Sequence, residues 1–163
     1  MKAQHYAYLC LALLLALGGF DTSWGYYAES SWYTHFTFHF AHASVWHLAG
    51  NALCFYALTR NRFVWAELAI AYGIATLCSF IAPHTLPTIG LSGLIFALYG
   101  MRLTRCRLSA EFIVRTAFIL LLPLLTGRVN VLLHIFCILV GYCVTLSHYN
   151  LNQTMKDAKR FNR

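Results

Sequence analysis

Charged residues are scarce in this chain: Asp, Glu, Lys and Arg make up 10% of its 163 residues, whereas a typical soluble domain has about 25%. Proline occurs three times, and only five residues are acidic. Hydrophobic residues make up 60% of the chain, and the mean hydropathy is +0.60. This composition excludes an ordinary soluble domain and predicts a protein embedded in a lipid bilayer.

The net charge of +7 does not predict nucleic-acid binding, because the basic residues are scattered at the ends of apolar segments. Lys and Arg flank membrane helices in this way. Five of the six cysteines lie within apolar segments, and we interpret them as buried small apolar residues. No Cys or His has partners at metal-ligand spacing, so we expect no metal and no cofactor.

Six apolar segments follow one another with short connections, at about residues 5–20, 43–59, 63–82, 91–104, 110–126 and 129–148. They predict an all-α, polytopic membrane protein: a single domain over residues 1–163 with six transmembrane helices and a short tail at about 150–163. The first segment is short for a span, which takes about 20 residues, and it also fits a secretory signal. We expect it to be retained as the first helix, because the six-helix fold requires it.

Basic residues are distributed unevenly between the two sides of this predicted bundle. Only Arg128 falls in an external segment, and Arg115 lies near the cytoplasmic end of the fifth apolar segment, to which its side chain can snorkel. Cytoplasmic segments are enriched in Lys and Arg, so we expect both termini in the cytoplasm and the protein in the cell (inner) membrane. The cytoplasmic residues would be Lys2, Arg60, Arg62, Arg102, Arg105, Arg107, Lys156, Lys159, Arg160 and Arg163.

The fourth apolar segment is unusually short. Pro83 and Pro87 interrupt the chain before it, and Ser92 precedes Arg102 by ten residues, or ~15 Å of helix. That is about half of a ~30 Å hydrocarbon core. The fourth helix is therefore expected to begin inside the bilayer, where irregular backbone must be enclosed by protein or line a cavity that holds water.

Four polar side chains fall at a similar depth, in the outer half of the predicted bilayer to within the error of a crude count along the helices. Counted from Arg60 at helical rise, Asn51 lies ~13 Å and His47 ~20 Å from the cytoplasmic face. Ser92 lies ~15 Å from that face, and His134 lies ~6–9 Å below the external surface. Polar groups at such depths are costly and suggest function. Helix packing and interhelical hydrogen bonding remain simpler explanations for each of them alone.

Small residues predict that the fourth and sixth helices approach closely, because small faces let membrane helices pack tightly. Gly93, Ala97 and Gly100 form one stripe. The other stripe is formed by His134, Cys137 and Gly141. If the two stripes meet, Ser92 lies beside His134.

This arrangement predicts nucleophilic catalysis by serine. Histidine is the usual base that activates a serine hydroxyl, and an oxyanion needs preorganised donors, for which the Ser92 N–H and the side chains of His47 and Asn51 are available. Glu67 and Glu111 are near cytoplasmic ends, so a Ser–His dyad is favoured over a triad. The remaining histidines receive no catalytic role: His42 is expected to point away from His47 as a structural residue, and no role is assigned to His5, His35, His39, His84 and His148.

Three motifs resemble those of rhomboid intramembrane serine proteases. The run HASVWHLAGN at residues 42–51 resembles their second-helix motif, and GLSG at residues 90–93 resembles their GxSG nucleophile motif. His134 followed by Gly141 resembles the sixth-helix histidine with its glycine stripe. The motifs occur in family order, and the combination is specific, although GxSG alone is weak.

The resemblance implies a minimal six-helix core, as in bacterial members, that cleaves transmembrane or juxtamembrane segments of membrane proteins. Ser92 would be the nucleophile and His134 the general base. His47 and Asn51 would line the oxyanion site, and Gly90 would shape the loop before the serine. Gly93, Gly141 and Phe96 would support the site, with Phe96 packing on the histidine.

Two residues depart from the family pattern. Trp32-Tyr33 stands where the family has a Trp-Arg pair in its half-submerged first loop, and Cys137 replaces the first glycine of the sixth helix. Neither change removes a catalytic group. A non-proteolytic relative that binds membrane-protein clients remains the alternative. A transporter is disfavoured because we see neither repeat symmetry nor charged intramembrane groups. Within the enzyme class, a general rhomboid and a dedicated processing protease for one set of C-terminally anchored proteins are both open.

Overall fold

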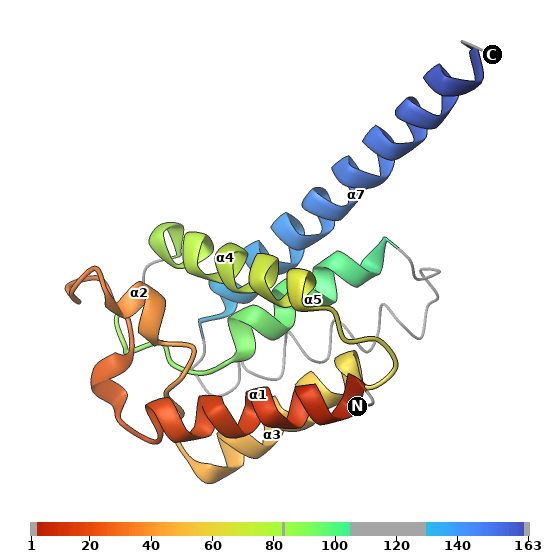
Figure 1. The fold of residues 1–163 in the computed structure, drawn as a ribbon. Coiled ribbons are helices and arrows are strands. Elements are labelled where there is room, and N and C mark those ends of the chain that lie inside the picture. Colours follow the sequence, from red (N-terminus) through yellow and green to blue (C-terminus); the bar gives the residue numbers. More distant parts are fainter. Residues whose placement is uncertain (1–2, 83, 105–129, 162–163) are drawn as a thin grey trace, which may run out of the picture.

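The computed structural model describes residues 3–82, 84–104 and 130–161, and these form helices joined by irregular segments (Figure 1). One isolated antiparallel bridge joins Tyr26 to Thr88. The expected all-α class is confirmed for these residues, whereas the expected fifth segment, 110–126, lies outside them. The helices are α1 (Ala3–Gly18), the 3-10 helix η1 (Thr22–Trp24), α2 (Thr34–Thr37), α3 (Val45–Thr59), α4 (Trp65–Ile81), α5 (Ser92–Leu103) and α7 (Val131–Phe161).

The helix ends lie within two residues of the expected ends of the apolar segments, with one exception. Helix α7 continues to Phe161, through the region expected to be a tail. Among the described residues, only α7, over Val131–Asn150, is both long and apolar enough to cross a membrane. Trp65–Ile81 and Ser92–Leu103 are shorter apolar helices. The count of six crossings therefore stays a prediction.

Helix α5 occupies the centre of the fold and packs against α3, α4 and α7. In Figure 1, α1 and α3 lie side by side below it, α4 lies above it, and α7 extends past the other helices toward the C-terminus. Tyr8 of α1 stacks on Tyr56 of α3, with ring centroids 5.5 Å apart, and Leu11 belongs to the buried core. The first apolar segment is thus an integral part of this helix bundle.

Glycines bring the backbones of α5 and α7 into direct contact, as the small-residue stripes predicted. A Cβ added at Gly100 would collide with the carbonyl of Ile138, and one added at Gly141 would collide with the carbonyl of Ala97. A Cβ added at Gly93 would lie 3.4 Å from the side chain of Leu133, in ordinary van der Waals contact. Close backbone approach of this kind maximises dispersion contact between membrane helices.

Cys137, which belongs to the predicted small-residue stripe of α7, also reaches α4. It is fully buried, and its thiol is in hydrogen-bonding contact with that of Cys78 on α4. The cysteine therefore fills the contact between α7 and α4.

The outward faces of the helices are strongly apolar. Trp46 and Leu53 of α3 are 85% and 68% exposed, and Leu77 of α4 is 70% exposed. Many large apolar side chains are exposed on these helices, as is expected where helices face lipid or a partner. Polar side chains concentrate inside the bundle and at its ends.

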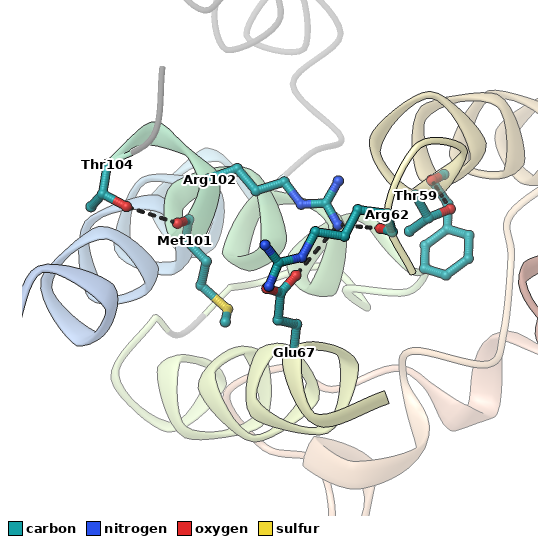
Figure 2. A network of polar contacts seen from close by, with 7 residues as sticks. Thr59, Arg62, Glu67, Met101, Arg102 and Thr104 are labelled. Atoms are coloured by element: carbon teal, nitrogen blue, oxygen red, sulfur yellow. Dashed lines mark hydrogen bonds and ion pairs between the residues drawn. The ribbon is translucent and has the colours of Figure 1, made fainter. Parts of the chain in front are cut away.

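A cluster of three charged residues ties the end of α5 opposite Ser92 to the α3–α4 connection (Figure 2). The Glu67 carboxylate lies 3.0 Å from Nη2 of Arg62 and 3.5 Å from Nη2 of Arg102. Arg102 also donates to the backbone carbonyl of Arg62 at 2.8 Å. The last turn of the short helix is held in place by these bonds, and a cation at a helix C-terminus also complements its dipole.

The α5–α7 contact predicts that Gly141→Ala destabilises the fold, because the new methyl group must displace the Ala97 backbone. Overpacking of this kind costs about 1–3 kcal/mol. Gly73→Ala is the matched control, since a Cβ at Gly73 meets nothing within 4 Å and gains up to about 1 kcal/mol of helix propensity. Thermal unfolding in detergent measures both variants. Equal midpoints for the two would contradict the close contact.

Candidate active site

Ser92 and His134 lie side by side where α5 and α7 begin. Ser92 Oγ is 2.9 Å from Nε2 of His134, a hydrogen-bonding distance. Ser92 is the first residue of α5, and His134 lies in the first turn of α7. The serine is partly buried, whereas His134 is only 4% exposed. The expected proximity of these two side chains is thus present.

The imidazole of His134 is fixed by the side chains around it. Phe96, one turn along α5 from Ser92, stacks on it with ring centroids 4.2 Å apart and an angle of 29° between the planes. Nδ1 of His134 is buried and has no hydrogen-bond partner among the described residues. No described carboxylate therefore orients this ring, and packing performs that task.

The start of α3 orients His47. Ser44 is the N-cap residue, and its hydroxyl accepts from the backbone N–H of His47 at 3.2 Å. The N–H of Ala43 donates to Nδ1 of His47 at 3.3 Å. Because Nδ1 accepts this bond, the proton of the neutral ring resides on Nε2. His47 consequently presents an N–H donor at Nε2.

Gly90 brings the chain that leads into Ser92 against His47 and Asn51. Its φ of +111° is a conformation that disfavours other residues, and a Cβ there would lie 2.6 Å from the imidazole of His47 and 3.1 Å from Nδ2 of Asn51. Its N–H donates to the Phe38 carbonyl at 2.8 Å. The backbone at Gly90 thus lies closer to both side chains than a residue with a Cβ would allow.

Asn51 points into a cavity of about 370 Å³ that also reaches Ser92 and His134. Its residue exposure is 8%, and Nδ2 has no hydrogen-bond partner among the described residues. A buried amide without a partner is costly, so a donor here is available to a bound group. The described residues lining the cavity are His47, Asn51, Cys54, Ala57, Leu58, Ser92, Ile95, Phe96, Tyr99 and His134.

Two expectations about residues near the site are wrong. His42 does not point away from His47: it is 2% exposed, and the two rings are 5.5 Å apart at 65°. The reason is that α3 begins at Val45, so helical spacing does not apply to His42. Cys54 was expected to be a buried apolar residue, but it is exposed and lines the cavity one turn beyond Asn51.

Two other histidines, to which the sequence assigned no role, are structural. His39 is fully buried, with Nε2 3.1 Å from the Thr76 hydroxyl. His35 lies between Tyr26 and Phe80, and its Nδ1 is 2.7 Å from the Ser79 hydroxyl. They join the segment before α3 to α4. The described residues contain no group of three His, Cys, Asp or Glu side chains that could hold a metal ion.

The sequence reasoning also missed Asn130. This buried residue precedes α7, and its Oδ1 accepts from the N–H of Leu133 at 3.0 Å. Its Nδ2 donates to Tyr26 Oη and to the Ala82 carbonyl, both at 2.9 Å, and to Thr88 Oγ1 at 3.3 Å. An Asn immediately before an apolar helical run is an N-cap signal, and that signal alone would have identified its contact with α7.

Comparison with known proteins agrees with this geometry. A model of the rhomboid domain matches residues 29–150, which is most of the chain. The chain belongs to the rhomboid family. Rhomboids are typically intramembrane serine proteases that act on membrane-protein substrates within the bilayer, although rhomboid-like pseudoproteases exist. Membership makes this chain an integral membrane protein. No curated protein and no solved structure matches it.

Gly90 supplies a test of the site's backbone in this rhomboid. Gly90→Ala is expected to displace His47 or the Ser92 loop, and a displacement of ~1 Å lowers a catalytic rate about 100-fold. Gly19→Ala is the control, because Gly19 also has a positive φ, +53°, yet a Cβ there meets nothing within 4 Å. Both variants place an alanine at positive φ, which costs on the order of 1–3 kcal/mol and more at +111° than at +53°. The rate of fluorophosphonate labelling distinguishes them, and a native rate in Gly90→Ala would contradict the tight contact.

Proposed function

We propose that this rhomboid is an intramembrane serine endopeptidase in which Ser92 is the nucleophile and His134 the general base. The observation that carries the proposal is the 2.9 Å distance between Ser92 Oγ and His134 Nε2. Serine becomes an effective nucleophile when an adjacent base accepts its proton. A Ser–His dyad fits better than a triad, because Nδ1 of His134 has no partner among the described residues.

The reaction proceeds in two halves. His134 Nε2 removes the Ser92 hydroxyl proton as Oγ attacks the peptide carbonyl, and the imidazolium then protonates the departing amine. Water attacks the resulting acyl-enzyme, His134 takes the proton of this water, and Ser92 regains a proton as the acid leaves. The stacked Phe96 keeps the imidazole in one orientation through both halves.

Three donors are proposed to stabilise the oxyanion. The N–H of Ser92 opens α5, and the first N–H groups of a helix have no partner within it. Nε2–H of His47 and Nδ2 of Asn51 both lie close to Gly90, and both residues line the cavity that reaches Ser92. Preorganised donors of this kind stabilise negative charge as it develops in the transition state.

The proposed substrates are membrane proteins cleaved in a transmembrane or juxtamembrane segment. This class is supported by the cavity, which apart from the site's polar residues is lined by Cys54, Ala57, Leu58, Ile95, Phe96 and Tyr99. Apolar side chains of the substrate, next to the cleaved bond, would fit into this cavity. By the distribution of Lys and Arg, the termini are cytoplasmic and the site opens to the external side of the cell membrane. If the chain instead only binds clients, capture survives without Ser92.

Labelling by a fluorophosphonate probe in detergent tests the dyad. The native chain should react, and Ser92→Ala and His134→Ala should each abolish labelling, because one removes the nucleophile and the other its base. His148→Ala, an exposed position on the same helix, is the matched control and should react normally. Undiminished labelling of His134→Ala would remove its proposed role, and an unreactive native chain would favour the client-binding alternative.

The oxyanion role of Asn51 predicts a specific loss of turnover. Asn51→Ala should lower the cleavage rate of a tagged single-span protein about 100- to 1,000-fold, the usual effect of losing one oxyanion donor. Stability should change little, since Nδ2 has no partner in the described structure to lose. Asn51→Asp keeps the size but replaces the donor by an acceptor. If Asn51→Asp cleaves at the native rate, donation by this amide is not required.

A further inference from the structure

The amide of Asn130 connects the helix of the proposed base to the loop that leads into the proposed nucleophile. Oδ1 accepts from Leu133 within the first turn of α7, so Asn130 fixes the end of the helix that carries His134. Nδ2 contacts three acceptors, of which Thr88 Oγ1 is the most distant at 3.3 Å. An amide NH₂ has only two protons, so Thr88 shares one of them.

The acceptors come from three separate parts of the fold. Thr88 lies two residues before Gly90 and four before Ser92. Its backbone exchanges two hydrogen bonds with Tyr26, at 2.8 and 3.2 Å. Ala82 is the residue after α4, and its carbonyl also accepts from Tyr26 Oη at 3.2 Å. Asn130 is therefore the point at which α7, the end of α4 and the Ser92 loop meet.

We propose that Asn130 is a positioning residue that sets the distance between Ser92 and His134, an inference that rests on the proposed function. The residue touches neither reacting atom. Its Nδ2 binds Thr88, four residues before Ser92, and its Oδ1 binds the N–H of Leu133, next to His134. The amide can therefore position both members of the dyad. All of these groups are buried, with Asn130 4%, Tyr26 1% and Thr88 9% exposed, so water cannot readily replace the bonds.

Asn130→Ser separates this role from helix capping. Serine retains an N-cap oxygen for the N–H of Leu133, but it has no amide to reach Tyr26, Ala82 and Thr88. We expect the maximal rate of fluorophosphonate inactivation, measured per folded molecule, to fall about 10- to 100-fold, as for a displacement of up to ~1 Å. The probe concentration at half-maximal rate should change little, because the cavity itself is intact.

Ser79→Ala is the matched control for stability. It removes a buried hydroxyl that donates to the Thr76 carbonyl at 2.6 Å and lies 2.7 Å from Nδ1 of His35, contacts in which the dyad has no part. If Asn130 contributes only stability, both variants lower the unfolding midpoint and both inactivate at the native rate. A native rate in Asn130→Ser would therefore overturn the proposal, whatever its unfolding midpoint.

Thr88→Val decides the matter if Asn130→Ser does not fold. Valine preserves the shape and the backbone pairing with Tyr26, and it removes the acceptor nearest to Ser92. The inactivation rate should fall about 2- to 10-fold, the range for one modest hydrogen bond, and an unchanged rate would overturn the proposal. Labelling of the native chain separates failure of the proposed function from failure of the role of Asn130. If the native chain does not react with the probe, the proposed function is wrong. If it reacts and both variants react at its rate, only the role of Asn130 is wrong.

Discussion

The arrangement of the site depends on the direct backbone contact between α5 and α7. Gly100 lies on the Ile138 carbonyl and Gly141 lies on that of Ala97, at a separation that no larger residue would allow. In lipid there is little hydrophobic drive to bring helices together, so close packing and interhelical hydrogen bonds must do it. Ser92 and His134 lie at the beginning of this same contact, and the packing that stabilises the bundle therefore also determines the distance between them.

The short length of α5 determines where the site lies within the bundle and which charge it favours. Helix α5 has twelve residues, so its N-terminus lies inside the bundle, where its unpaired N–H groups and positive dipole end favour an anion. The opposite end is held by Arg102, whose guanidinium contacts Glu67 and the Arg62 carbonyl. The irregular chain before Ser92 is enclosed by protein through the pairing of Tyr26 with Thr88 and of Gly90 with Phe38, as backbone at membrane depth requires.

The sequence predicted most of what depends on local spacing. Helix ends, the short α5, the glycine contact with α7 and the approach of Ser92 to His134 follow from composition, helical periodicity and the resemblance of the motifs. Side chains outside regular helices were harder to place. His42 was misplaced because its spacing from His47 was read as helical, although the helix begins at Val45.

Contacts between segments distant in the sequence were not predictable from one chain. Cys137 faces Cys78 on α4, and Asn130 contacts residues 42 to 104 positions away. Nothing in the local pattern specifies these partners, because polar atoms in loops are satisfied by whichever acceptors the tertiary fold brings near. The N-cap position of Asn130 was readable, yet its three amide contacts were not.

Some polar atoms of the site lack partners among the residues that the structure describes, and this bears on how the site could be stable and still carry out the proposed reaction. Buried polar groups are usually paired, and Tyr26, Thr88 and Asn130 follow this rule. Nδ2 of Asn51 and Nδ1 of His134 do not, within the described residues. The paired groups form part of the framework, and the unpaired amide of Asn51 lies beside the space where the proposed chemistry occurs. A bound carbonyl that gains negative charge would satisfy the Asn51 amide, so the free energy lost by leaving that amide unpaired in the resting protein would be recovered as the transition state forms.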